Sequence, residues 1–128
     1  MGADSVLKKL GGSSLPIYIE TTNTVYEYYN NQQHHKIYIN ETYKTYDKLL
    51  LIALSGSVGY ANQVVVNDGT IEEQKLFSNT FTYWDNGTLR QQATYVYYII
   101  LSDLSNMEYI DLIYGGTGSY NFNIFGIK

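Results

Sequence analysis

The sequence predicts an all-β protein: an antiparallel β-sandwich, most economically a single jelly roll of eight to ten strands. Short stretches in which apolar and polar residues alternate recur along the chain, and clusters of turn residues separate them at regular spacing. The chain also contains 15 tyrosines, and aromatic residues favour strands. No segment shows the strand–helix–strand rhythm of a parallel sheet.

One short helix is expected before the sandwich. Residues 3–10 have an apolar helical face, and the two following glycines can end the helix. That apolar face consists of Ala3, Val6, Leu7 and Leu10. A helix this short is not stable alone, so it must dock on its own domain, on a neighbouring subunit or on a membrane surface. Two lysines make only a weak membrane-binding patch, so docking on protein is favoured over docking on a membrane. We therefore divide the chain into an N-terminal helix and linker arm, 1–14, and a β-sandwich domain, 15–128.

The strands of the sandwich follow from the alternation. Residues 49–54 are apolar throughout, which predicts a strand covered on both faces, with a short helix as the alternative. Residues 67–69 and 85–87 carry the signals of tight hairpin turns. We expect strands at 17–19, 25–29, 36–43, 49–54, 63–66, 70–73, 75–84, 88–102, 107–114 and 120–127.

Composition excludes several classes of function. The net charge is −4, from 8 Lys and Arg against 12 Asp and Glu, and the basic residues are scattered, which argues against nucleic-acid binding. Without cysteine, no disulfide or thiolate zinc site can form. The stretch MGADSVLKKLGG is too short and too polar for a secretory signal, so none is expected, and the longest apolar run, 49–54, is too short to cross a bilayer.

Both histidines lie in the stretch YYNNQQHHKIY. Adjacent residues of a strand point to opposite faces, so His34 and His35 cannot both hold one ion from extended backbone. The nearest carboxylates in the sequence are Glu27 and Glu41. We interpret residues 30–35 as a polar, solvated hairpin loop rather than a metal site. A pH-responsive contact at a subunit boundary is the third interpretation.

No motif predicts catalysis. The serine in residues 56–59 lacks the spacing and the following helix of a hydrolase elbow. The glycines of residues 115–119 match neither phosphate-loop pattern. No spacing singles out a pair of carboxylates for glycoside hydrolysis. We therefore predict no catalytic residue, no metal ligand and no cofactor, and a protein that is not an enzyme.

The only tryptophan stands beside a predicted turn. Trp84, Asp85 and Asn86 together resemble the tip of a sugar-binding loop, in which a ring stacks on the sugar and polar groups take its hydroxyls. A tryptophan that closes the edge of the core beside the turn is the other interpretation. A carbohydrate-binding module is thus the alternative function.

The strongest functional signal is distributed over the chain. In residues 95–101 both faces are apolar or aromatic, so one face is expected to pack on the core and the other to be covered by the N-terminal helix, a loop or another subunit. Charged residues are only 16% of the chain, which favours a subunit of a larger assembly. The candidate subunit interface consists of Val6, Leu7, Leu10, Tyr95, Tyr97, Tyr98 and Phe125.

Several features together resemble small virion structural proteins of the jelly-roll kind, especially those of viruses that infect thermophilic archaea. These are the absence of cysteine, the richness in Tyr, Asn and Ile, the early helix SVLKKL and the final strand YNFNIFGIK. The resemblance implies a capsid, vertex or decoration subunit, located in the virion, that binds copies of itself or other virion subunits. We therefore expect a non-enzymatic structural subunit.

Overall fold

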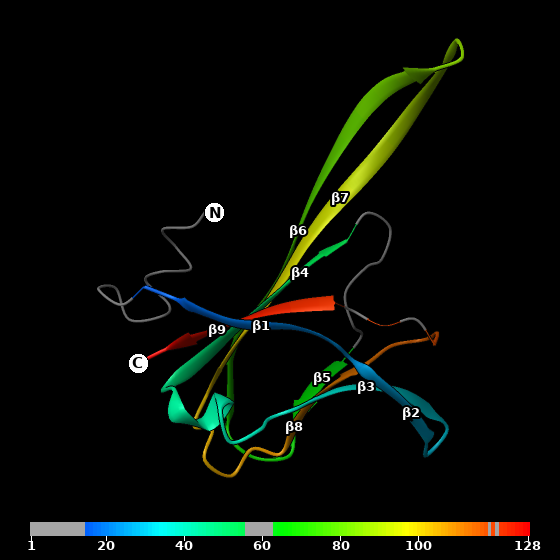
Figure 1. The fold of residues 1–128 in the computed structure, drawn as a ribbon. Helices are drawn as coiled ribbons and strands as arrows, with labels where there is room; N and C mark the ends of the chain where they lie inside the picture. The colour runs from blue at the N-terminus through cyan, green and yellow to red at the C-terminus, as the bar shows by residue number, and fades with distance from the viewer. Residues whose placement is uncertain (1–14, 56–62, 118, 120) are drawn as a thin grey trace.

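A computed structural model describes residues 15–55, 63–117, 119 and 121–128. In these residues the protein is all-β, with two antiparallel sheets that pack as a β-sandwich (Figure 1). The only helical element among them is the 3-10 turn η1 (Tyr43–Thr45). The helix expected at residues 3–10 lies outside the described residues.

The five-stranded sheet has the order β1-β9-β4-β7-β6, and neighbours are antiparallel. Its strands are β1 (Ile17–Asn23), β9 (Asn121–Ile127), β4 (Lys48–Ser55), β7 (Thr88–Ser102) and β6 (Thr70–Asp85).

The four-stranded sheet has the order β2-β3-β8-β5, also antiparallel. Its strands are β2 (Val25–Tyr29), β3 (Gln32–Tyr38), β8 (Tyr109–Ile113) and β5 (Gln63–Val66). Only Thr24 separates β1 from β2, so the chain passes directly from one sheet to the other.

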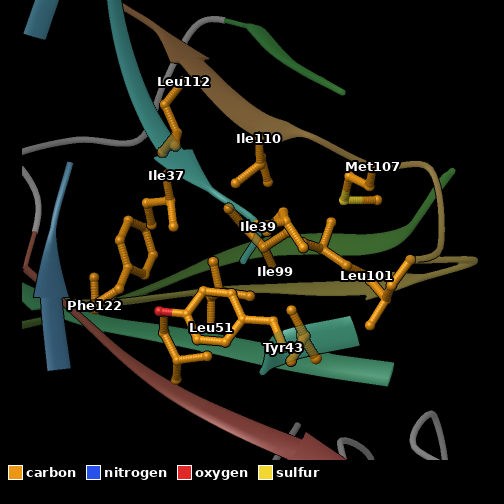
Figure 2. Packing of buried hydrophobic residues seen from close by; sticks show 14 of the residues in the cluster. Ile37, Ile39, Tyr43, Leu51, Ile99, Leu101, Met107, Ile110, Leu112 and Phe122 are labelled. Atoms are coloured by element: carbon orange, nitrogen blue, oxygen red, sulfur yellow. The ribbon is translucent and has the colours of Figure 1, made fainter. Parts of the chain in front are cut away.

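The core lies between the two sheets (Figure 2). Alternate residues of β4 and β7, including Leu51 and Ile99, meet Ile37 of β3 and Leu112 of β8. Their side chains are almost fully buried, and each such aliphatic side chain contributes about 1.5–3 kcal/mol.

A second apolar cluster lies on the outer face of the five-stranded sheet. Leu50, Tyr98, Ile100 and Ile127 are buried there, with the half-buried Phe125 packed against them. Residues 49–53 and 97–101 therefore have buried or half-buried side chains on both faces of the sheet, whereas Val96, which is 37% exposed, departs from the expectation.

The predicted histidine loop is wrong. Only Asn30 and Asn31 form the turn, both with positive φ of 52° and 59°. Asparagine tolerates this conformation, which two-residue hairpin turns require. The strand β3 begins at Gln32, so His34 and His35 belong to a strand, and both are buried.

Three other expectations are wrong. The turn at residues 67–69 does not make a hairpin, because β5 pairs with β8 and β6 pairs with β7. Residues 70–73 and 75–84 form a single strand, β6, whose alternation is broken by an irregularity between Ile71 and Glu73. The strand expected at 36–43 ends at Tyr38, and Tyr43 lies in η1.

The β6–β7 hairpin extends far beyond the sandwich (Figure 1). Its turn is confirmed: Asn86 and Gly87 both have positive φ, 47° and 76°. Since β4 pairs with β7 only from Tyr95 to Ser102, residues 79–94 form a ribbon of two strands. We call residues 79–94 the arm, which is a different segment from the N-terminal linker arm at 1–14.

Candidate functional site

The arm is exposed along its length. Every residue from 79 to 92 is exposed, including Phe81, Tyr83, Trp84 and Leu89. A two-stranded ribbon buries little of its own apolar surface, so it gains stability from a partner. Large exposed apolar side chains gathered on one element are typical of an interaction site.

Both faces of the arm carry apolar side chains. Phe81 and Tyr83 share one face, with their ring centroids 5.9 Å apart. Trp84 and Leu89 face each other on the opposite side. The only charged residues of the arm are Asp85 and Arg90, whose Oδ2 and Nε atoms lie 2.9 Å apart at its tip. The body of the arm therefore carries no charge that would repel an apolar partner.

A hollow of about 360 Å³ lies where the arm joins the sandwich. It is lined by Gln74, Lys75, Leu76 and Tyr97. The Tyr97 hydroxyl donates a hydrogen bond of 2.8 Å to Oε1 of Gln74, which fixes both side chains. Since β6 is the last strand of its sheet, this hollow lies at a sheet edge.

The predicted interface residues are dispersed by the fold. Val6, Leu7 and Leu10, and the side chain of Tyr95, lie outside the described part of the structure. Tyr97 packs in the core between the sheets. Tyr98 and Phe125 belong to the outer-face cluster. The role of these residues in an interface stays a prediction. Tyr97 packs toward the second sheet and also lines the hollow at the base of the arm.

The predicted sugar-binding residues lie together at the tip of the arm. Trp84 is 71% exposed there, so it does not close the edge of the core. Sequence reasoning did not identify Phe81, Tyr83 and Leu89 as surface residues. The strand lengths indicate this exposure: β6 and β7 have 16 and 15 residues, whereas β4, which pairs with β7, has only 8.

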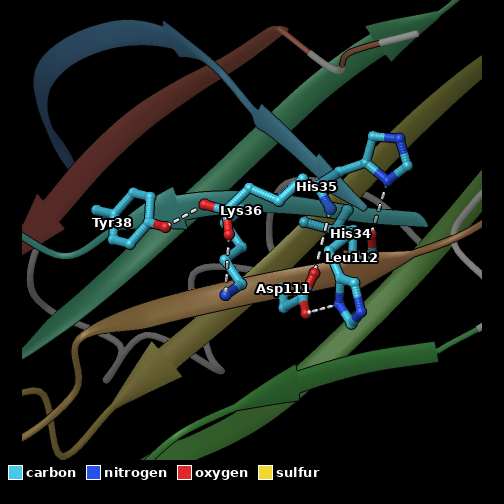
Figure 3. Close-up of polar contacts among 7 residues, drawn as sticks. His34, His35, Lys36, Tyr38, Asp111 and Leu112 are labelled. Atoms are coloured by element: carbon cyan, nitrogen blue, oxygen red, sulfur yellow. Dashed lines mark hydrogen bonds and ion pairs between the residues drawn. The ribbon is translucent and has the colours of Figure 1, made fainter. Parts of the chain in front are cut away.

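A second group of polar residues lies on the outer face of the four-stranded sheet (Figure 3). Ile37 and Leu112 face the core, so His34, Lys36 and Asp111 project from the opposite face. Nδ1 of His34 lies 2.6 Å from Oδ2 of Asp111, and the backbone N–H of His35 donates to Oδ1 at 3.1 Å. The carboxylate of Asp111 thus joins β8 to β3 twice.

Tyrosines cover this polar group. The ring of Tyr29 stacks on His34 with centroids 3.7 Å apart and planes 2° apart. The Lys36 ammonium lies 4.8 Å from the Tyr29 centroid and 4.3 Å from that of Tyr109. A cation over an aromatic face is attracted by the ring. These rings explain why His34, Lys36 and Asp111 are buried on an outer face.

Electrostatic contacts perturb three groups here. The pKa of Glu27 is lowered, first by a hydrogen bond from the Tyr38 hydroxyl and also by Lys36, although partial desolvation opposes this. The same hydrogen bond raises the pKa of Tyr38. Desolvation would lower the pKa of Lys36, but contacts with Tyr29 and Glu27 outweigh it and raise that pKa. Lys36 is therefore held as a cation.

The second histidine lies on the core side of the same strand. Nδ1 of His35 lies 3.0 Å from the Leu112 carbonyl oxygen, and Nε2 lies 3.0 Å from that of Gly116. Its ring stacks on Tyr114, with centroids 3.6 Å apart. The histidines thus occupy opposite faces of β3, as adjacent strand residues must.

This geometry favours structural roles for both histidines. Nε2 of His34 is buried without a hydrogen-bonding partner in the described parts of the chain, and His34 lines neither the hollow beside Tyr97 nor the one beside Asp103. Nowhere in the described ranges do three His, Cys, Asp or Glu side chains gather in a way that could hold a metal ion. The His34–Asp111 pair ties two strands together.

Comparison of the chain with protein-family models, with curated proteins and with solved structures finds no match. The described part of the chain contains no helix that is long and apolar enough to cross a membrane.

Proposed function

We propose that this protein is a non-enzymatic structural subunit of a larger assembly, and that the arm is its docking element. The observation that carries this proposal is the arm itself, which projects from the sandwich, exposes Phe81, Tyr83, Trp84 and Leu89, and is uncharged below its tip. Interfaces of stable complexes are enriched in aromatic side chains and depleted of charge at their centre. The arm has this composition.

A virion shell is the proposed setting, which follows from the resemblance to small jelly-roll virion proteins. The strand order supports it. In a jelly roll the first strand lies beside the last, and the chain crosses repeatedly between two sheets. The order β1-β9-β4-β7 fits one such sheet, and β3-β8-β5 fits the other. The strand β6 departs from the pattern, because it pairs with β7 instead of extending the sheet of β5.

The oligomeric mass of the pure protein tests this proposal. We expect Phe81→Ser with Tyr83→Ser to shift the protein toward the monomer in size-exclusion chromatography with light scattering. The matched control is Val25→Ser, since Val25 is exposed on β2, in the other sheet. Its mass should equal that of the unmodified protein. A wild-type protein that is monomeric at millimolar concentration would overturn the proposal.

The exposure of Trp84 favours one alternative function, carbohydrate binding at the tip of the arm. A ring that is 71% exposed beside Asp85 and Asn86 can stack on a sugar while the polar side chains take hydroxyls. A glycan array tests it, with Trp84→Ala as the binding-site variant and Leu89→Ala as the neighbouring control. If no glycan binds, or if Trp84→Ala binds equally well, this alternative fails.

A further inference from the structure

The outer edge of β6 is long and lacks most of the features that protect a sheet edge from pairing. β6 has 16 residues and is the last strand of its sheet, and no described strand pairs with its outer edge. Proteins commonly protect such edges with lysine, proline or a bulge. Residues 76–84 contain no charged residue and no proline, and the one irregularity of β6 lies below them, between Ile71 and Glu73.

The sequence of this edge is complementary to itself. Residues 75–85 read KLFSNTFTYWD, and Thr80 is at the centre. If a second copy runs antiparallel with Thr80 opposite Thr80, then Lys75 faces Asp85, Leu76 faces Trp84, and Phe77 faces Tyr83. Opposite charges and aromatic pairs that lie directly across two antiparallel strands stabilise the pairing. Each favourable pair occurs twice because the arrangement is two-fold symmetric.

The backbone of β6 suits this register. Asp85 and Thr88 flank the two-residue turn, so they form a hydrogen-bonded pair. The odd-numbered residues of the arm in β6 therefore direct their N–H and C=O groups toward β7, and the even-numbered residues direct theirs toward the free outer edge. Thr80 belongs to this second set, together with Leu76 and Trp84. Thr80 of each copy can therefore exchange two backbone hydrogen bonds across the axis.

The hollow at the base of the arm adds an independent reason for this register. Leu76 lines the hollow and packs on the core side of the sheet together with Tyr97. Residues directly opposite in an antiparallel pair project to the same face. Trp84 of the second copy would therefore project beside Leu76, at the hollow of about 360 Å³. An exposed ring on one copy and a hollow on the other meet in a single register.

We propose that two copies of this chain pair edge to edge, antiparallel along β6, with the two-fold axis at Thr80. The five-stranded sheets of both copies then form one continuous sheet, as in β-strand addition. This inference rests on the proposed assembly function and specifies which surface and which register perform it.

Cysteine cross-linking tests the register directly, because the natural chain has no cysteine. In Thr80→Cys the two new side chains face each other across the axis, at a Cα separation of about 5.5 Å, within disulfide range. In the control Thr82→Cys the two positions lie about 14 Å apart along the strands, beyond the limit of about 7 Å. We expect Thr80→Cys to form a covalent dimer under mild oxidation, and Thr82→Cys to stay uncross-linked.

Charge reversal provides a second test. Lys75→Asp places two acids opposite each other, and Asp85→Lys places two bases opposite each other. Each single variant should weaken dimerisation at least about tenfold, whereas the double variant restores the opposite-charge pairs and the association. Circular dichroism checks that each variant remains folded.

The outcomes separate this inference from the proposed function. A covalent dimer of Thr80→Cys alone, with rescue by the double charge variant, supports the register. If the protein associates by light scattering but both cysteine variants cross-link equally or not at all, the register is wrong and the assembly function stands. A protein that is monomeric at millimolar concentration overturns both.

Discussion

Trp84 and Leu89 face each other across the tip of the arm, on the same side of the ribbon, and they are 71% and 57% exposed. Neither belongs to an apolar cluster of the sandwich. The fold therefore gains little from these two side chains, although burying them would be worth about 1.5–3 kcal/mol each. Their exposure is explained if another surface covers them.

Replacing this pair should separate association from stability. We expect Trp84→Ala with Leu89→Ser to weaken self-association at least about tenfold, while the free energy of unfolding changes by less than about 0.5 kcal/mol. Sedimentation velocity measures the first, and urea denaturation of the dilute protein measures the second. A variant that loses more than about 2 kcal/mol of stability would mean that the tip packs within its own chain.

Removing the carboxylate that joins β3 to β8 should destabilise the fold. Asp111→Ala leaves Nδ1 of His34 and the backbone N–H of His35 without their acceptor, in a region where Asp111 is only 2% exposed. We expect a loss of about 2–4 kcal/mol, since each buried group left unpaired costs about 1–3 kcal/mol. The control is Glu41→Ala, whose exposed ion pair with Lys44 is worth less than about 1 kcal/mol. Similar unfolding midpoints for both variants would contradict the bridging role.

Stability should fall at alkaline pH because of two buried tyrosines. Burial raises the pKa of Tyr43, with Glu20 adding to it, and burial together with Glu73 raises the pKa of Tyr98. A folded-state pKa above the ordinary value of 10.0 means that this stability is complete below pH 10 and is lost as pH rises above it. Tyr43→Phe and Tyr98→Phe should each flatten the pH dependence of the unfolding free energy above pH 10. Slopes identical to that of the wild type would refute this.

A glycine in β9 leaves room for a neighbouring tyrosine ring, so replacing it should destabilise the fold. The ring of Tyr46 occupies the place that a side chain on Gly126 would need, whereas no atom lies within 4 Å of a Cβ at Gly115. Gly126→Ala should therefore displace Tyr46 and cost about 1–3 kcal/mol, as overpacking does elsewhere. Gly115→Ala should change stability by less than about 0.5 kcal/mol. Thermal unfolding of the two variants, side by side, checks the difference.

The sequence predicts the local features of this fold well. The strand at 88–102 and the turn at 85–87 are found as expected, because the turn signal Asp-Asn-Gly acts within a few residues. The strand at residues 49–54 is also found, since an unbroken apolar run between polar residues favours a strand with two buried faces.

Features that depend on distant contacts were not predicted. The burial of His34 requires Tyr29 and Asp111, which come from two other strands, so a polar pair of histidines resembles a loop in the sequence. The residues of the turn at 67–69 would be the same whether the turn closes a hairpin or connects two strands of different sheets. Only the pairing of β5 with β8 decides between these.

The arm was partly predictable. Its turn and both strands follow from the sequence. Its projection from the sandwich does not, because that depends on where the pairing of β4 with β7 ends. The apolar residues of the arm stand on both of its faces, as they would on a covered strand. The sequence therefore indicates that a partner is needed and does not say whether the partner is the same chain.

Self-association through the arm is tested most simply by the mass of the unmodified protein in solution, measured by light scattering across a range of concentrations. We expect a mass that rises with concentration from 14.6 kDa to at least twice that value, as the arms of neighbouring copies pair. A mass that stays at 14.6 kDa up to millimolar concentration would contradict it.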